Sequence, residues 1–514
     1  MKKNNPIQPF GERSFESEFK RLGEKKWEEY YFEHTDFVKK ALHKDTYLIV
    51  GRRGCGKSSL LQHILFQDEY QKSDFINFGL AETYIDQLLK IANNINFSQE
   101  LKVQKLVKLW EYIIWQIIFK KLENNNKEIR KGIHEECTDP SILNFIKLII
   151  KGILNKNEIN SGDDVIEMLT KRTHEKNYIC ARECVLNILA SKPLYIAIDS
   201  REKYSLRDEN EMNIAAALIQ CACKINIEFG YQGLQIKVCV ADEIFPYLKE
   251  DYITNTLKYV RYPLFMQWKP KDLIKLVCWR FFKYLKLNNL SNLSENDINW
   301  DSHTDILEKI WYPHFGKKLI NRRGVEEDTF PYIVRHTHLR PRQLIFICNY
   351  IARISRENDE FPRFSEATIK EGVLNSEYSL ADELINSYSS IYPNIGDIIS
   401  ALQGLPIEFK WSELRRAARR SATHWENGNW SDFIRLVIEL GIIGRKREET
   451  NYNSKIIKAD FEFALRDRLF LSEKDICVIH PLFYSKLNIN RNNPSDYCVY
   501  PFPNKPEFEM MNGN

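Results

Sequence analysis

Residues 46–65, "TYLIVGRRGCGKSSLLQHIL", constrain the fold more than any other stretch, because they join a strand pattern to a glycine-rich turn. Gly51, four further residues, then Gly56, Lys57 and Ser58 satisfy the P-loop spacing G-x-x-x-x-G-K-[ST]. The apolar run before Gly51 is typical of a buried parallel strand, and the apolar residues after Lys57 recur at helical spacing. The sequence therefore predicts an α/β P-loop NTPase fold, a parallel sheet with helices on both faces.

The chemistry of this loop predicts ATP and Mg²⁺ as cofactors. Glycines let the backbone curl so that its N–H groups point at phosphate oxygens, aided by the helix N-terminus. Lys57 is expected to reach the β- and γ-phosphates, and the Ser58 hydroxyl to bind Mg²⁺. The predicted nucleotide-binding residues of the loop are Gly51, Gly54, Gly56, Lys57, Ser58 and Ser59. The flanking strand argues against a chance glycine turn.

Two further apolar strands end in carboxylates. "KPLYIAIDSREKY" (192–204) ends its strand at Asp199, which we interpret as the Walker B carboxylate that binds Mg²⁺ together with Ser58. Glu202 either polarises the attacking water or is a solvated loop charge. "LQIKVCVADEIF" (234–245) ends in Asp242, a candidate sensor of the γ-phosphate or a helix cap.

The motifs beyond the loop carry a family resemblance. The chain resembles the bacterial P-loop ATPases of the AAA+/STAND group, relatives of ORC-type initiators that are often encoded in phage-defence and mobile-element loci. The similar segments are the charged lead-in "PFGERSFESEFKRLGEKKWEEYYFEHTDFVKKAL", "VRYPLFMQWKPKDLIKLVCWRF" at the start of a lid, the sensor 2-like "HTHLRPRQLIFICNYIA", and "FIRLVIELGIIGRKREE" with "DICVIHPLFYSKL" near the end of a winged helix.

The resemblance implies additional site residues. One guanidinium of Arg340 and Arg342 is expected on the γ-phosphate, with the choice between them open, and a surface position at a helix start is the alternative for both. His480 of "IHP" is expected either to touch the nucleotide in the resting state or to be a packed or capping histidine. Arg261 is a candidate arginine finger in a homo-oligomer, or a plain surface arginine.

The same reading divides the chain into domains. A helical insertion is expected at about 80–190, because more than a hundred residues separate the loop helix from Asp199. The predicted domains are an N-terminal helical lead-in (1–45), the P-loop domain (46–268), a helical lid (269–390), a C-terminal winged-helix domain (391–490) and a tail (491–514).

Composition limits the partners. With 74 basic and 70 acidic residues the net charge is +4, so bulk charge does not bind nucleic acid and any contact needs a local patch. We expect no membrane span, no secretory signal, and a cytoplasmic location with 11 reduced cysteines and no zinc site. One candidate patch for duplex DNA lies on a single helical face: Arg415, Arg416, Arg419 and Arg420.

Two functions remain open from the sequence. The first is a nucleotide-dependent conformational switch whose ATPase cycle assembles or regulates a separate effector protein, with anti-phage defence implied by the resemblance. No effector motif is found in the chain, so a partner would carry the downstream chemistry. The second is a DNA-dependent ATPase or loader that binds duplex through the winged helix.

Overall fold

The computed structural model describes most of the chain. The described residues are 8–33, 35–64, 74–79, 82–95, 98–137, 139, 141–154, 162–199, 208–322, 324–389, 392, 394–422, 430–447, 456–465, 468–489 and 498–501, without the side chains of residues 82, 83, 162 and 163. The chain divides into two compact units: unit 2 spans Thr35–Met266, and unit 1 combines Met1–His34 with Gln267–Asn514. The chain therefore begins in unit 1, forms unit 2, and then completes unit 1.

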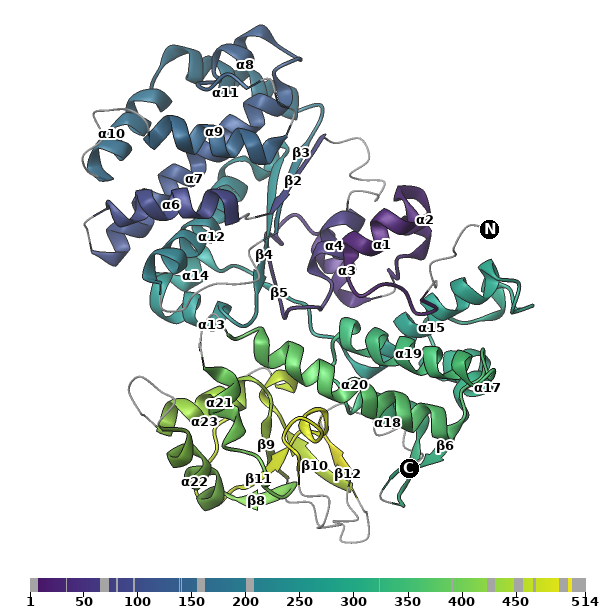
Figure 1. The fold of residues 1–514 in the computed structure, drawn as a ribbon. Helices are drawn as coiled ribbons and strands as arrows, with labels where there is room; N and C mark the ends of the chain where they lie inside the picture. The colour runs from purple at the N-terminus through teal and green to yellow at the C-terminus, as the bar shows by residue number, and fades with distance from the viewer. Residues whose placement is uncertain are drawn as a thin grey trace. The chain divides into compact units, whose positions relative to one another are not determined.

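Unit 2 is an α/β unit (Figure 1). Its elements are α3 (Asp36–Leu42), β1 (Leu48–Gly51), α4 (Lys57–Ile64), β2 (Asp74–Gly79), α6 (Glu82–Asn93), α7 (Gln99–Leu122), α8 (Lys127–Lys131), α9 (Ile142–Leu154), α10 (Gly162–Thr173), α11 (Lys176–Leu189), β3 (Leu194–Asp199), α12 (Glu209–Phe229), η1 (Gly230–Gln232), β4 (Leu234–Ala241), α13 (Phe245–Tyr247), η2 (Leu248–Tyr252), α14 (Thr256–Tyr259) and β5 (Leu264–Phe265).

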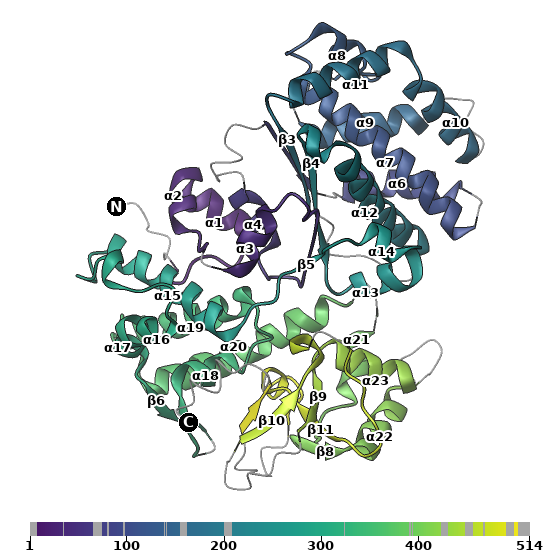
Figure 2. The ribbon, with the colours of Figure 1, turned by 180° about the vertical axis from the view of Figure 1, so that it is seen from behind.

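The five strands of unit 2 form one sheet in the order β2-β3-β4-β1-β5. Every neighbouring pair is parallel. Both views show α12 and the α6–α11 helices on one face of the sheet and α3 and α4 on the other (Figures 1 and 2). With both faces covered, β1 and β4 are buried along their whole length. The sequence correctly predicts this arrangement, a parallel sheet with helices on both faces.

The helices α6 to α11 lie between β2 and β3 in the chain and form a helical layer. The longest of them is α7. Aromatic and aliphatic residues of α7 pack against α12 in a single core that continues into the sheet. The described residues 82–95, 98–137, 139, 141–154 and 162–189 of this stretch are therefore helices and their connections, within the range where the sequence predicts a helical insertion.

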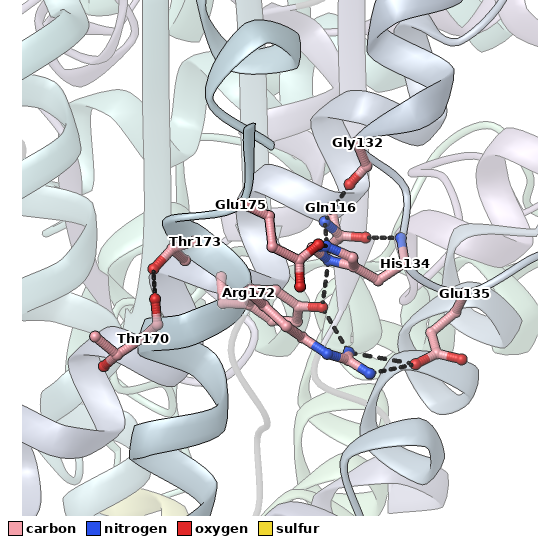
Figure 3. Close-up of polar contacts among 9 residues, drawn as sticks. Gln116, Gly132, His134, Glu135, Thr170, Arg172, Thr173 and Glu175 are labelled. Atoms are coloured by element: carbon pink, nitrogen blue, oxygen red, sulfur yellow. Dashed lines mark hydrogen bonds and ion pairs between the residues drawn. The ribbon is translucent and has the colours of Figure 1, made fainter. Parts of the chain in front are cut away.

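A buried polar cluster joins the helices of this layer (Figure 3). The side-chain amide of Gln116 donates to the Gly132 carbonyl at 3.0 Å and accepts from the His134 N–H at 2.9 Å. The Arg172 guanidinium, 7% exposed, donates to the Tyr112 hydroxyl at 2.8 Å. These bonds satisfy polar groups that burial would otherwise leave without partners, and so stabilise one arrangement of α7, α10 and the 132–135 connection.

Unit 1 contains helices and two small sheets. Its elements are α1 (Phe15–Leu22), α2 (Glu24–Tyr30), α15 (Pro270–Leu287), η3 (Glu295–Asp297), α16 (His303–Ile306), η4 (Leu307–Trp311), α17 (Tyr312–Phe315), β6 (Lys318–Ile320), β7 (Glu326–Asp328), α18 (Thr329–Val334), α19 (Pro341–Glu357), α20 (Glu366–Asn386), α21 (Ile395–Ser400), β8 (Glu408–Lys410), α22 (Trp411–Ser421), α23 (Trp430–Glu439), β9 (Ile443–Lys446), β10 (Ile456–Asp460), η6 (Glu462–Ala464), β11 (Ile476–Ile479), η7 (Pro481–Phe483) and β12 (Cys498–Tyr500).

The first helices of the chain pack on α15 rather than leading directly into β1. Phe10 is fully buried and its ring stacks on Phe281 at 4.8 Å between centroids. The Glu18 carboxylate binds the Arg280 guanidinium at 2.8 Å. The sequence treats residues 1–45 as one lead-in, but the structure divides this segment between the units after His34. The packing partner is an aromatic surface more than 250 positions away, which no local pattern reveals.

The C-terminal sheet has the order β12-β10-β9-β11-β8, and its last strand comes from the predicted tail. Cys498 to Tyr500 pair in parallel with β10 and are buried. The Tyr500 hydroxyl donates to Glu327, whose carboxylate also receives two hydrogen bonds from Arg335, both 3.0 Å long. These residues therefore belong to the folded body of unit 1. No helix among the described residues is long and apolar enough to cross a membrane.

Lys237 is a buried lysine inside β4. Its ammonium group donates to the carbonyls of Thr46 at 2.9 Å and His43 at 3.2 Å, which holds the connection between α3 and β1 against the sheet. Burial lowers the pKa of Lys237 to about 7. Removing a lysine charge from water favours the neutral amine, which still donates both hydrogen bonds.

This pKa predicts a specific pH dependence. Between pH 7 and the ordinary lysine pKa of 10.5 the unfolded chain binds a proton that the folded chain does not, so the Lys237 contribution makes the free energy of unfolding rise with pH. From pH 7 to pH 9 we expect the free energy of unfolding to rise by about 2 kcal/mol more in the wild type than in Lys237→Met. Urea unfolding of both proteins at both pH values checks this. Equal pH slopes would contradict the lowered pKa.

Candidate functional site

The candidate loop lies at the carboxyl edge of the sheet of unit 2. Strand β1 pairs with β4 on one side and β5 on the other, with Gly51 opposite Ala241. Because all strands are parallel, the residues that follow β1, β3 and β4 meet at the same edge. Lys57 and Asp242 follow β1 and β4, and Asp199 is the last residue of β3.

Glycine is needed at the three glycine positions of the loop for different structural reasons. Gly54 and Gly56 have φ angles of 79° and 99°, which side-chain-bearing residues rarely adopt. Gly51 is required for space, because a Cβ there would lie 2.5 Å from the Cys55 sulfur and 3.1 Å from Met266 Cβ. The loop therefore turns sharply and packs tightly at the same time.

The second half of the loop presents unbonded backbone donors. In the part of the chain that the structure describes, the N–H groups of Gly54, Gly56, Lys57, Ser58 and Ser59 donate to no acceptor. They lie at the N-terminus of α4, where the helix dipole favours negative charge. A curled loop with a row of free amides at a helix start is an anion-binding arrangement, and phosphate is the anion that this motif suits.

Lys57 provides the positive charge of the site. Its side chain is 8% exposed, and its ammonium donates to the carbonyls of Gly51 at 2.7 Å and Arg52 at 3.2 Å. Burial alone lowers the pKa of Lys57, but the surrounding thiols and carboxylates, Glu243 among them, outweigh it and raise the pKa above its ordinary value. Lys57 is therefore a charged group held on the loop, next to the free amides.

Ser58 and Asp199, the two residues for which the sequence predicts Mg²⁺ binding, lie in contact at the sheet edge. The Ser58 hydroxyl donates to the Asp199 carboxylate at 2.5 Å, although 141 positions separate them. A hydroxyl and a carboxylate are hard oxygen ligands of the kind that Mg²⁺ prefers, so these two residues fit the metal. No group of three or more His, Cys, Asp and Glu residues able to hold a metal is found within the described residues.

The end of β4 holds the first half of the loop. The Arg52 guanidinium lies 3.3 Å from the Asp242 carboxylate, and the Arg53 N–H donates to the Glu243 carboxylate at 3.2 Å. Asp242, the predicted sensor, thus contacts the loop itself. Sequence reasoning missed Arg52 and Arg53, because they occupy the variable positions of the motif; the only signal was a pair of acidic residues at the end of a buried strand.

The remaining candidates lie elsewhere. Glu202 falls outside the described residues. Arg261 is exposed in unit 2, where its backbone N–H donates to the Tyr47 hydroxyl at 2.9 Å. In unit 1, Arg340 is the buried N-cap of α19 and Arg342 lies 3.6 Å from Glu383. A phosphate contact by any of these residues stays a prediction.

His480 lies in a histidine and phenylalanine cluster of unit 1. The ring is fully buried, its Nδ1 accepts from the Leu482 N–H at 3.1 Å, and it lies 4.7 Å from the His338 ring between centroids. Burial, reinforced by His336 and Arg335, lowers the pKa of His480 well below its ordinary value. In this conformation His480 is a neutral, packed capping residue, and a nucleotide contact stays a prediction.

The arginines of α22 fall into two groups. Arg415 lies 3.5 Å from Glu473 and above the Trp430 ring, and Arg420 donates to the Ala401 carbonyl at 2.8 Å. Arg416 and Arg419 are exposed and have no partner among the residues that the structure describes. Only two of the four predicted cations are therefore fully available on the surface.

Comparisons with known proteins give distant similarities. No protein-family model matches the chain. It is 22% identical over 517 residues to the putative transposon gamma-delta 80.3 kDa protein of Escherichia coli (strain K12), covering 94% of this chain and 67% of that protein.

Two solved structures are also similar. Cdc6p from Pyrobaculum aerophilum aligns with 88% of this chain and 89% of its own, at 11% identity and a TM-score of 0.30. The ORC2 protein of Aeropyrum pernix, in ADPNP–ADP complexes, aligns with 87% of this chain and 88% of its own, at 10% identity and a TM-score of 0.36. None of these similarities is high enough to assign the chain to a family.

Proposed function

We propose that this chain binds ATP with Mg²⁺ at residues 51–59 and hydrolyses it. The observation that carries the proposal is the row of free amide groups beside the charged Lys57, with the Ser58 hydroxyl already in contact with Asp199. These groups match the parts of a triphosphate site: donors for phosphate oxygens, a cation for the β- and γ-phosphates, and oxygen ligands for the metal.

The chain's own residues would act mainly by positioning and by neutralising charge. Bound Mg²⁺ would add positive charge to the phosphate oxygens and orient them. Ser58 and Asp199 would hold the metal, and Lys57 would turn from the loop carbonyls toward the phosphates. For the attacking water and the transition-state charge we retain Glu202 and an arginine, Arg342, Arg340 or Arg261, as proposals.

We further propose that the ATPase cycle operates a conformational switch. Unit 2 holds the nucleotide and is joined to unit 1 by two peptide connections, at 34–35 and 266–267. We interpret α15 to α20 as a lid and the segment from α21 to β12 as a winged-helix domain, and we propose that their movement assembles or releases a partner protein, in a homo-oligomer or alone. The transposon in the name of the Escherichia coli relative fits the mobile-element context that the AAA+/STAND resemblance implies, and anti-phage defence is the role proposed from that resemblance.

The nucleotide site predicts a binding defect in Lys57→Ala. Loss of one charge-assisted contact to phosphate should weaken binding of a fluorescent ATP analogue by about tenfold to a hundredfold. Fluorescence titration with Mg²⁺ present checks this. Lys90→Ala, an exposed lysine of α6, is the matched control and should bind as the wild type does. Undiminished affinity in Lys57→Ala would refute the phosphate-binding assignment.

Asp199 predicts a different defect. Asp199→Asn should bind the analogue within a few-fold of the wild type, since the amides and Lys57 remain, but should lose roughly tenfold or more in phosphate release through a weaker metal site. A malachite green assay at several Mg²⁺ concentrations checks this, and high Mg²⁺ should restore part of the rate. Wild-type turnover at low Mg²⁺ would place the metal ligand elsewhere.

A second candidate function, a DNA-dependent ATPase, is favoured by one observation. Arg416 and Arg419 lie on one face of α22, exposed and without partners among the described residues. Exposed arginines on a helix are suited to phosphate contacts with duplex DNA. In this case DNA would bind unit 1 and stimulate turnover at the loop of unit 2.

Charge reversal separates the two functions. Arg416→Glu with Arg419→Glu should weaken duplex binding. The slope of log K against log salt concentration should become smaller by about two, since each lost phosphate contact releases one counterion fewer. Fluorescence anisotropy across a salt series checks this. Lys286→Glu with Arg353→Glu, on other helices of unit 1, is the charge-matched control. If both double variants lose the same DNA affinity, the loss comes from the change in net charge and not from the α22 arginines. That result would favour the partner-protein switch.

A further inference from the structure

The first half of the loop and the end of β4 are joined residue by residue. The Asp242 N–H donates to the Gly51 carbonyl at 3.2 Å, the Arg52 guanidinium contacts the Asp242 carboxylate, and the Arg53 N–H donates to Glu243. The free amides begin only at Gly54. The loop thus has a fixed half, held by β4, and a half that is available to a ligand.

The fixed half introduces an electrostatic conflict. Asp199, Asp242 and Glu243 bring three carboxylates to the edge where a polyphosphate is to bind. Asp199 has a role with the metal, but the charge of Asp242 would repel the nucleotide. The Arg52 and Asp242 side chains are 18% and 25% exposed, so water screens their charges only partly.

We propose that Arg52 is a positioning residue that neutralises Asp242 and thereby sets the affinity of the loop for a nucleoside triphosphate. This inference rests on the proposed function. In this proposal Arg52 acts through Asp242 and not by contact with phosphate, because its guanidinium lies 3.3 Å from the Asp242 carboxylate at the end of β4. The pair lets a carboxylate hold the loop at the end of β4 without adding net negative charge to the site.

A double-mutant cycle tests the proposal by the sign of its coupling. Arg52→Ala leaves Asp242 unpaired and should weaken binding of the fluorescent ATP analogue by roughly tenfold. Asp242→Asn keeps the backbone contact to Gly51 and removes the charge, so it should bind as tightly as the wild type or more tightly. The double variant should recover to within about threefold of the wild type.

Salt provides a second readout, because a defect caused by one unpaired charge should shrink between low and high ionic strength. If the double variant stays as weak as Arg52→Ala, Arg52 contacts phosphate directly and the proposal is overturned. If Asp242→Asn alone weakens binding as much as Arg52→Ala, the pair acts through loop shape and the proposal is equally overturned. Arg52→Gln, measured beside Arg52→Ala, keeps the side-chain volume and should show the same defect.

The same binding measurements distinguish a failure of the Arg52 proposal from a failure of the proposed nucleotide site. If the wild type and Lys57→Ala bind the analogue equally poorly, the nucleotide site itself fails. If the wild type binds, Lys57→Ala does not, and the cycle shows no rescue, only the role of Arg52 fails. Circular dichroism and urea unfolding of every variant show that each is folded.

Discussion

The carbonyl oxygen of Gly51 accepts two hydrogen bonds, one from the Lys57 ammonium and one from the Asp242 N–H. The candidate site depends on this oxygen, because it joins the last residue of β1 to the start of α4 and to the end of β4. The absence of a side chain at Gly51 makes the approach possible, since the Cys55 sulfur occupies the space that a Cβ would need. A buried strand and a glycine thus place a lysine, a helix N-terminus and two acidic residues at one edge.

The position of β1 also relates the site to the rest of the chain. Unit 2 begins with α3 and ends with β5, and α3 packs against both β5 and α4. Strand β5 pairs directly with β1. The two connections to unit 1, at 34–35 and 266–267, therefore adjoin α3 and β5, and these elements contact α4 and pair with β1.

Residue chemistry singled out Ser58 and Asp199 as candidate metal ligands, from the spacing of the motif and from a buried strand that ends in aspartate, and the two side chains lie in contact. Their role with a metal stays a prediction. The partner of Arg52 could not be predicted in the same way. Arg52 occupies a position that accepts any residue, and its contact depends on β4 lying between β1 and β3. Tyr500 is a similar case: it lies in the predicted tail (491–514), yet its strand pairs with β10 and its hydroxyl donates to Glu327.

The sequence by itself determined the local parts: a strand, a glycine turn with left-handed residues, an amphipathic helix, and the residue types of a phosphate and metal site. Each of these depends on backbone geometry and periodicity over a few neighbouring residues. Only the tertiary structure decided the strand order, the division of the N-terminal segment between two units, the burial of His480 and the pairing of Arg52 with Asp242. These depend on which apolar surfaces exclude water together, and the partners in that burial are set by contacts across the whole chain.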